Sequence, residues 1–263
     1  MQCWRSDMHG IICAGAKTKG ALRERGVERV PLLTVNGETI LARTCRSLRE
    51  GAGCKHVCVL APEEVPLPDD SSAIRGQYSG ALVADVLHYV RQKTTEEYIV
   101  LAGGDMPLIT PQAFAALRAA GTFSQADLVY PIVLREEIEA AFPGTQRTYL
   151  RLGGRQYSGG NAFWLRREWL LTQADLITEL FARRKSILKL AQLFGLGFLL
   201  RIAVGAATKE YLEQHLGAVV HAKLVAEVLP YPELAVDLDK AVDLDTFAGY
   251  LDPLDEQRGT SAM

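Results

Sequence analysis

A glycine pair followed by an acid, Gly103-Gly104-Asp105-Met106-Pro107, is the segment of this sequence best suited to chemistry. It directly follows the apolar run 98–102, which is typical of a strand buried on both faces of a sheet. Ligands of open α/β sheets gather outside the carboxyl ends of the strands. We therefore expect Asp105 at such an edge, where a lone carboxylate can hold a divalent cation beneath a phosphate.

A second acidic site is formed by Asp237 and Asp239, which are separated by one residue. Side chains two positions apart point to the same side of a strand, and a short strand is expected at 234–238. Together with Asp105, the pair would complete an oxygen ligand set for Mg²⁺. The alternative for Asp239 is a purely structural role as the N-cap of the last helix.

A loop with two lysines follows the first expected strand, at 11–14. Its sequence is Ala14-Gly15-Ala16-Lys17-Thr18-Lys19-Gly20, which matches neither the Gly-x-Gly-x-x-Gly pattern nor the Walker A motif. Four cations, Lys17, Lys19, Arg23 and Arg25, could still lie along a triphosphate, because cations on a flexible loop are free to close over it. The alternative is a mobile, lysine-containing surface loop.

Later in the chain, Ser158-Gly159-Gly160-Asn161 suits the close approach of a sugar or phosphate, and Asn161 offers both a donor and an acceptor. A hairpin turn would use the same residues. Arg183-Arg184-Lys185 is a cationic cluster that is either a solvated helix face or a neutraliser of departing pyrophosphate.

The elements that must position these residues alternate between strand and helix. Strands are expected at 11–14, 57–60, 98–102 and 128–133, with helices beginning after Thr39, at Ser79 and after Thr110. This alternation indicates an α/β fold with a parallel sheet. Beyond it we expect strands at 148–152, 162–165, 198–204, 219–225 and 234–238, a largely helical stretch at 168–194 and a last helix at 241–251. The chain is interpreted as one domain, 1–263, with a helical insertion at 168–217.

Composition narrows the class of protein. A net charge of -2 over 263 residues gives no sign of nucleic-acid binding. The most hydrophobic region, 188–204, is interrupted by Lys189, Gln192 and Arg201, so it is too short and too charged to span a bilayer, and contact with a membrane surface is the alternative left open. Five scattered cysteines favour reduced thiols and a cytoplasmic location, and the five histidines show no zinc-ligand spacing.

Taken in order, these motifs resemble the MobA-like NTP transferases, nucleotidyltransferases of the GT-A type. The resemblance covers nearly the whole chain and is carried by Ala14-Gly15, the segment 31–37, Gly104-Asp105-Met106-Pro107-Leu108, Gly159-Gly160-Asn161 and Asp237-Leu238-Asp239. It implies a three-layer, Rossmann-like fold with a mostly parallel central sheet. It also implies Mg²⁺-dependent transfer of a nucleoside monophosphate from an NTP to a phosphorylated small-molecule acceptor, with release of pyrophosphate.

The resemblance further implies roles for individual residues. Asp105 would bind Mg²⁺ with Asp237 or Asp239, and Asp105, Lys17, Lys19 and Arg23 would form the catalytic set. The nucleotide would contact residues of the first loop, of the second helix start and of the strand end, namely Ala14, Gly15, Ala16, Gly76, Ser79, Gly80 and Gly104. The acceptor would contact Arg147, Tyr149, Gly160, Asn161, Arg184 and Lys185.

The sequence departs from the family pattern at two points. The usual Arg-Met of the first loop is missing, and Val30 stands near the place of a lysine that normally stabilises the transferred phosphorus. Lys17, Lys19 or Arg29 are the candidates to replace it. Two other functions stay open: a GT-A glycosyltransferase that uses a nucleotide sugar, and a non-catalytic nucleotide-binding protein. The sequence also leaves open the base, the acceptor and whether the chain forms a homodimer.

Overall fold

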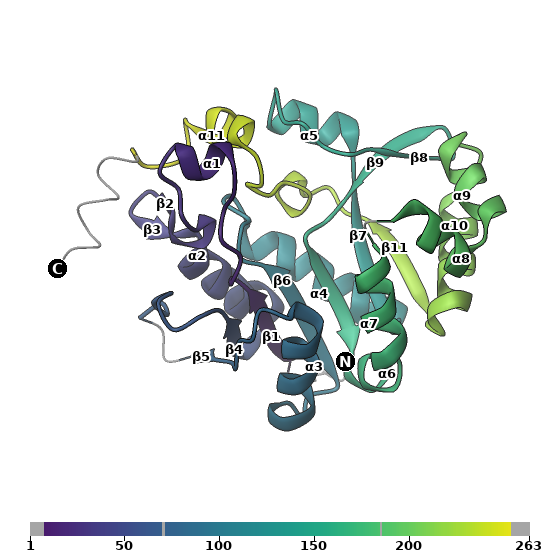
Figure 1. Cartoon of the computed structure of the whole chain (residues 1–263), viewed down its shortest axis with the longest axis horizontal. Helices are drawn as coiled ribbons and strands as arrows, with labels where there is room; N and C mark the ends of the chain where they lie inside the picture. The colour runs from purple at the N-terminus through teal and green to yellow at the C-terminus, as the bar shows by residue number, and fades with distance from the viewer. Residues whose placement is uncertain (1–7, 70–71, 185, 254–263) are drawn as a thin grey trace.

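The computed structural model describes residues 8–69, 72–184 and 186–253, and its centre is a nine-stranded sheet (Figure 1). The strand order is β5-β4-β1-β6-β10-β7-β9-β8, and β11 also pairs with β7. The strands are β1 (Met8–Cys13), β4 (Cys54–Leu60), β5 (Ala73–Arg75), β6 (Tyr98–Gly103), β7 (Leu128–Leu134), β8 (Leu150–Leu152), β9 (Arg155–Gly159), β10 (Ala162–Arg166) and β11 (Leu224–Val228). A separate two-stranded ribbon joins β2 (Thr34–Val35) and β3 (Glu38–Thr39).

The sheet is mostly parallel. β1 runs parallel to β4 and β6, with Cys13 level with Leu60 and Gly103. β10 is the exception in the middle, since it pairs antiparallel with both β6 and β7. Its first residues therefore lie at the edge where the parallel strands end.

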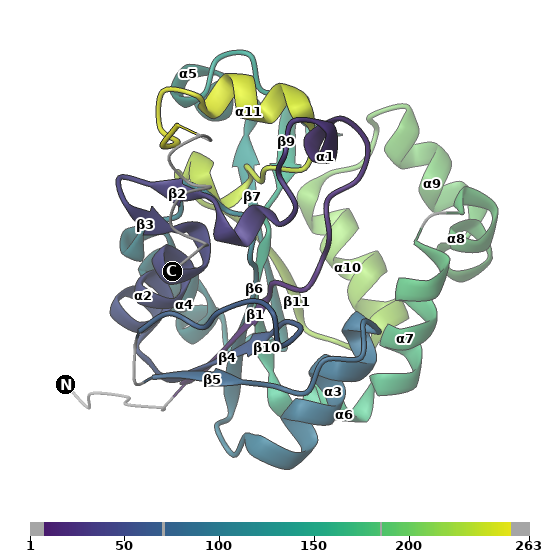
Figure 2. The same cartoon turned by 60° about the vertical axis from the view of Figure 1, so that its left-hand side comes forward.

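Helices cover both faces of the sheet, because side chains alternate along each strand. Ile12 packs in the core beneath α2 (Ile40–Ser47) and α4 (Pro111–Ser124), whereas Ile11 packs on the opposite face with α3 (Leu82–Lys93) and α6 (Arg167–Thr172). Figure 2 shows α2 and α4 on one side of the strands and α7 and α10 on the other. The predicted three-layer α/β fold is confirmed.

Helix starts depend on local capping. Thr39 and Thr110 accept hydrogen bonds from the backbone N–H groups of Ala42 and Ala113, at 3.1 and 3.2 Å, as predicted. Ser79 does not begin the second helix, which starts three residues later at Leu82. Its N–H instead donates to the Asp85 carboxylate at 3.0 Å, which holds the turn before the helix.

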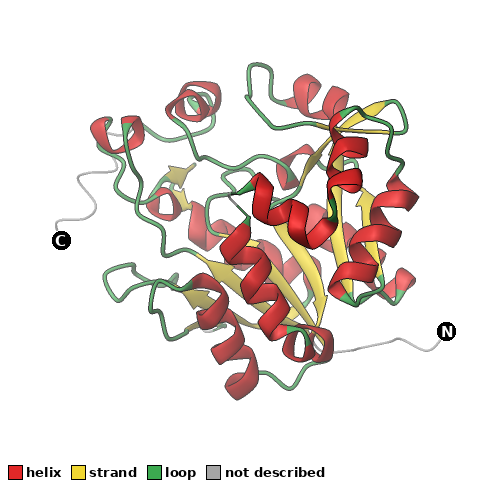
Figure 3. Cartoon of the chain, turned by 45° about the vertical axis from the view of Figure 1, so that its right-hand side comes forward, coloured by secondary structure: helices red, strands yellow, loops and turns green. Residues whose placement is uncertain are grey.

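A group of helices follows β10, as predicted for 168–194: α6, α7 (Ala174–Arg183), α8 (Ile187–Phe194), α9 (Leu196–Ala203) and α10 (Lys209–Val220). Figure 3, in which all helices are red and all strands yellow, shows helices packed against the sheet. The shorter helices are α1 (Ala21–Glu24), η1 (Val30–Leu32), η2 (Leu48–Ala52), α5 (Arg135–Ala141), η3 (Pro232–Leu234) and α11 (Ala241–Phe247). That the chain is one domain with an inserted helical segment stays a prediction. Among the residues with assigned structure, no helix has the length and apolar character needed to cross a bilayer.

Three predicted strands are wrong or displaced. Residues 198–203 belong to helix α9, which ends at Ala203 (Val204 is in the following turn). Phe198 is buried against the rings of Phe194 and His215, which fixes this helix to α10. The strand expected at 234–238 is absent: Leu234 ends the short helix η3, and residues 235–238 continue as irregular chain. The strand expected at 219–225 is β11, which begins only at Leu224 because α10 continues to Val220.

Candidate functional site

Asp105 lies where three distant segments of the chain meet. The N–H of Gly103 donates to the backbone oxygen of Asn161 at 2.9 Å, and the N–H of Gly104 donates to that of Cys13 at 3.0 Å. The backbone oxygen of Asp105 accepts from the N–H of Leu238 at 2.9 Å. These bonds join the ends of β1 and β6, the start of β10 and the C-terminal acidic segment at one edge of the sheet.

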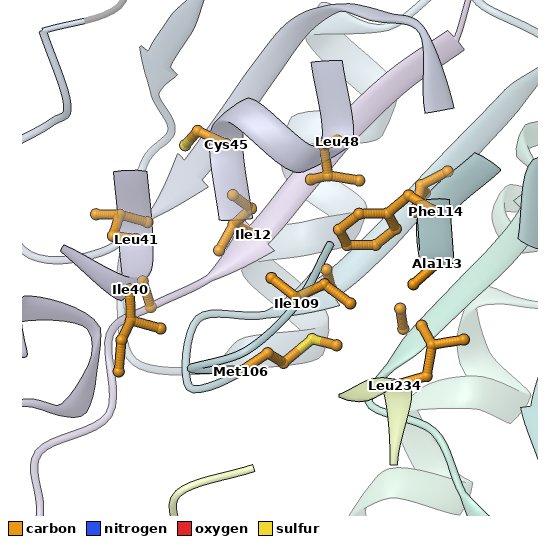
Figure 4. Packing of buried hydrophobic residues seen from close by; sticks show 14 of the residues in the cluster. Ile12, Ile40, Leu41, Cys45, Leu48, Met106, Ile109, Ala113, Phe114 and Leu234 are labelled. Carbon is orange, nitrogen blue, oxygen red and sulfur yellow. The ribbon is translucent and has the colours of Figure 1, made fainter. Parts of the chain in front are cut away.

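Close packing explains the second glycine. A Cβ on Gly104 would lie 2.8 Å from the Cβ and 3.0 Å from the Cα of Ala14, closer than ordinary contacts allow. Figure 4 shows the residues after Asp105 turning into the core, where Met106 and Ile109 are buried beside Ile12 and Phe114. The loop that carries Asp105 is therefore anchored on both sides of the acid.

The surroundings of Asp105 oppose its ionisation. Burial, followed by the nearby Asp237 carboxylate, raises the pKa of Asp105 from 3.8 to about 7, and Asp239 adds to the effect. Burial also raises the pKa of the neighbouring Cys13 thiol to about 12. A cation placed beside these carboxylates would relieve their mutual repulsion.

Asp105 and Asp239 line one hollow, of about 180 Å³, together with Lys17 and Lys19. We call this the acidic hollow. The N-cap of the last helix is Lys240, not Asp239. Asp243, in the first turn of α11, accepts from the N–H groups of Asp239 and Lys240 at 3.0 and 2.7 Å. The Asp239 side chain is exposed at the hollow.

Asp237 has a different environment. It does not share a strand face with Asp239, and its carboxylate pairs with Arg147. Arg147 also donates to the backbone oxygen of Asp237 at 2.6 Å and to the Asp243 carboxylate at 3.0 Å. Burial raises the pKa of Asp237, and the Arg147 guanidinium opposes that shift.

Within the described part of the chain, no three His, Cys, Asp or Glu residues are grouped as a ready metal site. Mg²⁺ commonly uses one or two carboxylates and takes its other ligands from substrate phosphates and water. The two carboxylates of the acidic hollow fit that pattern.

The loop that carries the lysines is held in place. The Arg29 side chain donates to the backbone oxygen of Gly15 at 2.8 Å and pairs with Glu64 at 2.6 Å. The N–H of Thr18 donates to the backbone oxygen of Glu28 at 3.0 Å. Because Arg29 is occupied in this way, Lys17 and Lys19 are the cations that face Asp105.

Val30 also lines the acidic hollow, close to the place where the family pattern has a lysine. Ala14 and Gly104, both predicted for the nucleotide, line it as well. Arg23 lies on α1, is exposed and does not line this hollow. Val30 and the two lysines of the first loop thus line the same hollow.

A second hollow, the aromatic hollow, has about 550 Å³ and adjoins Asp105. Five residues predicted for nucleotide or acceptor contact line it: Gly15, Ala16, Gly80, Gly160 and Asn161. Three aromatic residues that sequence reasoning missed complete it: Tyr78, Tyr130 and Phe163. The Tyr78 hydroxyl donates to the backbone oxygen of Gly15 at 3.0 Å.

Two residues predicted for the nucleotide lie elsewhere. Gly76 is packed inside the fold, where a Cβ would come within 2.5 Å of Leu60. Ser79 is bound to Asp85 and does not line the aromatic hollow. The signal that could have found Tyr78 is its position directly before Ser79-Gly80.

A third hollow, the Arg147 hollow, has about 470 Å³ and lies beyond Asn161. Arg147, Tyr149, Asp237 and Asp239 line it, and so does Lys240, which sequence reasoning missed. Asn161 lines both this hollow and the aromatic one. The aromatic hollow and the Arg147 hollow thus meet at Asn161, close to Asp105, Asp237 and Asp239.

Arg184 is not brought to these hollows. Its guanidinium carbon lies 3.4 Å from the centre of the Phe181 ring, and its side chain donates to the backbone oxygen of that residue at 2.6 Å. Lys185, the other cation predicted for the acceptor from this cluster, lies outside the described residues.

Comparison with solved structures supports the same architecture. A hypothetical transferase from Thermus thermophilus is 29% identical over 90% of this chain and 99% of its own, with a TM-score of 0.77. A CMP:2-keto-3-deoxy-manno-octonic acid synthetase complexed with CTP shares the fold at 13% identity and a TM-score of 0.58, over 96% of this chain and 100% of its own. A 2-C-methyl-D-erythritol 4-phosphate cytidylyltransferase, also from Thermus thermophilus, shares it at 14% identity and a TM-score of 0.53, over 91% of this chain and 96% of its own.

A comparison with curated proteins gives no match. The family model of the MobA-like NTP transferase domain matches residues 24–193, which is more than half of the sequence. The chain therefore belongs to the MobA-like NTP transferase family.

Proposed function

We propose that this nucleotidyltransferase moves a nucleoside monophosphate from an NTP to a phosphorylated small-molecule acceptor, with Mg²⁺, and releases pyrophosphate. One observation carries the proposal: Asp105 and Asp239 line the same hollow as Lys17 and Lys19. Carboxylates that hold a cation and lysines that neutralise phosphate are the two charge types that transfer from a triphosphate needs.

In the proposed reaction, an acceptor phosphate oxygen attacks the α-phosphorus of the NTP. The bond from that phosphorus to the bridging oxygen breaks, and pyrophosphate leaves with the electron pair. Lys17 and Lys19 stabilise the negative charge on the triphosphate. The reaction needs no covalent enzyme intermediate, so the main task of the protein is to align the two substrates.

The presence of two neighbouring hollows, the aromatic hollow and the Arg147 hollow, supports separate binding sites for the nucleoside and the acceptor. The aromatic hollow offers the rings of Tyr78, Tyr130 and Phe163 to the nucleoside, and the Arg147 hollow offers Lys240 and Asn161 to the acceptor. Arg147 is already paired with two carboxylates, so we assign it to holding the acidic segment in place. Tyr149 lines the acceptor side.

Asp105 and Asp239 would hold Mg²⁺ in the acidic hollow. When bound there, the cation supplies neutralising charge to the α-phosphate and to pyrophosphate. The Asp105 environment supports this assignment, because burial beside other carboxylates favours a bound cation over an isolated anion.

A thermal-shift screen of the four NTPs, with and without Mg²⁺, tests nucleotide binding, since a ligand of the folded form raises its melting temperature. Pyrophosphate release on adding phosphorylated acceptors then tests the reaction. Release of a nucleoside diphosphate from a nucleotide sugar would instead support the glycosyltransferase alternative. Tight binding of an NTP without turnover on a broad acceptor panel would support a non-catalytic role.

A further inference from the structure

The helices α8 and α9 form a hairpin at the outer side of the molecule. Figure 2 shows the pair beyond α7 and α10, on the side away from α2, and Figure 1 shows the same helices at the edge of the molecule. We call residues 187–204 the outer hairpin. None of the three hollows around Asp105 includes a residue of this segment.

The outer hairpin exposes large apolar side chains. The exposed fractions are 80% for Leu188, 64% for Leu196, 55% for Leu200 and 74% for Val204. The last three are spaced by four residues and therefore share one face of α9 and its end. Several large apolar side chains exposed on one helix usually mark a site of interaction.

The opposite side of α9 is well packed. Phe198 is 7% exposed, and its ring stacks on His215 of α10 at 4.3 Å between ring centres. The hairpin is therefore fixed to the molecule by one face while the other stays uncovered. The apolar face formed by Leu196, Leu200 and Val204 is thus presented outward from a fixed position, as is the apolar face of segments that enter a membrane interface.

The charge of the outer hairpin and its surroundings distinguishes between a lipid surface and a second copy of the chain as the partner of this face. Residues 180–209 contain no Asp or Glu, although the whole chain carries a net charge of -2. The same stretch contains six cations: Arg183, Arg184, Lys185, Lys189, Arg201 and Lys209. Arg183 and Lys209 pair with Glu179 and Glu213, which lie outside it.

Three further cations stay unneutralised. Within the part of the chain that the structure describes, Arg184, Lys189 and Arg201 have no carboxylate partner, and all three are exposed. A two-fold dimer through this face would set the same cations against each other. An anionic lipid surface instead complements the cations and accepts the leucines between them.

We propose that the outer hairpin docks the protein on an anionic lipid surface, with Leu196, Leu200 and Val204 entering the interface and Lys189 contacting headgroups. Arg201 lies over the Tyr211 ring and donates to the backbone oxygen of Ala206 at 3.2 Å, so it adds positive charge to this face from a fixed position. Docking through this face leaves the three hollows outside the contact. The enzyme would then work at the membrane surface without spanning the bilayer.

The test is flotation of the purified full chain with two kinds of vesicle, pure phosphatidylcholine and an equal mixture with phosphatidylglycerol. We expect binding to the anionic vesicles only, weakened by high salt. Lys189→Glu should weaken it by roughly 10- to 30-fold, because one cation is replaced by an anion. The double variant Leu196→Ser and Leu200→Ser should weaken it by about tenfold or more.

Phe123→Ser is the matched control, because Phe123 is 93% exposed on α4, outside the outer hairpin. It should bind vesicles like the unaltered chain, and circular dichroism should show that every variant is folded. Absence of binding to anionic vesicles would overturn the proposal, as would equal loss in the Phe123 variant. If light scattering shows a dimer that the leucine variants dissociate, a second copy covers this face instead.

Discussion

At the scale of single residues, Asp105 is constrained through both its backbone and its side chain. Its backbone oxygen accepts from the N–H of Leu238, and its half-buried carboxylate lies near those of Asp237 and Asp239. A group placed in this way is costly to the fold unless it has a function, since burial of a carboxylate opposes its charge.

Asp105→Asn should lower the rate of pyrophosphate release by about 100-fold or more, because it removes a main electrostatic support of the reaction. Steady-state kinetics with the NTP that binds would measure this. Asp175→Asn, which alters an exposed acid on α7, is the control and should keep the full rate. Full activity of the Asp105 variant would refute its assignment.

The lysines of the first loop carry a second prediction. Lys17→Ala and Lys19→Ala should each lower kcat by roughly 10-fold or more if these side chains replace the missing family lysine, because each neutralises phosphate charge. Lys93→Ala, at the exposed end of α3, is the matched control. If neither loop variant changes kcat, the phosphate must be neutralised by another group.

The sequence predicted that Asp105, Lys17 and Asn161 lie at one edge of the sheet, because each lies close to the end of a strand that the structure contains. Asp239 was predicted to join them although the strand expected before it is irregular chain. Their chemical roles stay predictions. The sequence did not indicate Tyr78 or Lys240, which are on irregular chain without a periodic pattern. It also could not show that Asp237 is paired with Arg147, since 90 residues separate the two in sequence.

At the scale of elements, glycine gives a paired prediction. Gly104→Ala should lower the free energy of unfolding by about 1–3 kcal/mol, because the new methyl group meets the backbone of Ala14. Gly197→Ala, on α9 with no atom within 4 Å of the added Cβ, should be neutral or stabilise by up to about 1 kcal/mol. Urea unfolding measures both, and an equal effect of the two would contradict the close approach of β1 and β6.

The strand β1 also carries a pH-dependent residue. Burial lowers the pKa of His9 from 6.5, although Glu96 opposes the shift. The unfolded chain then binds more protons than the native one just below pH 6.5, so His9 makes stability fall as the pH falls through that range.

We expect the difference in the free energy of unfolding between the unaltered chain and His9→Asn to become smaller as the pH falls from about 8 to about 5. Denaturant unfolding at several pH values measures it. His221→Asn, at an exposed position with a positive φ of 50° that Asn tolerates, is the control. A difference that stays constant with pH would show that His9 is not the responsible group.

The elements that were predicted well from the sequence have a clear local signal. The strands β1, β4, β6 and β7 each contain an apolar run, and α2 and α4 each begin after a capping threonine. Residues 198–204 were misassigned because a short apolar run has no period that separates strand from helix. Only the contact of Phe198 with α10 decides the matter.

At the scale of the whole molecule, Arg147 connects the chain after α5 to the acidic segment near the C-terminus. Its side chain is 8% exposed and pairs with Asp237 and with the 1% exposed Asp243. Arg147→Ala should therefore cost roughly 3–5 kcal/mol of stability, because it leaves buried carboxylates without a partner.

The same change should release Asp239 from its place, so activity should fall together with stability. Thermal unfolding and pyrophosphate release measure the two effects. Arg183→Ala is the control, since the ion pair of Arg183 with Glu179 lies at the surface of α7, away from the three hollows, and its loss should cost about 1 kcal/mol or less. A folded, fully active Arg147 variant would show that the acidic segment is held by other contacts.

The antiparallel course of β10 has a consequence for how specificity can change. The ring of Tyr78 and the loop at Gly15, which line the aromatic hollow, come from the first third of the sequence. The Arg147 hollow is lined by Arg147, Tyr157 and Lys240, which come from the second half. Asn161 stands between them because β10 begins where its neighbours finish. Exchanging only the segment 146–158 with that of a relative should thus change the acceptor while Tyr78, Tyr130 and Phe163 keep the original base, so the two preferences can evolve separately.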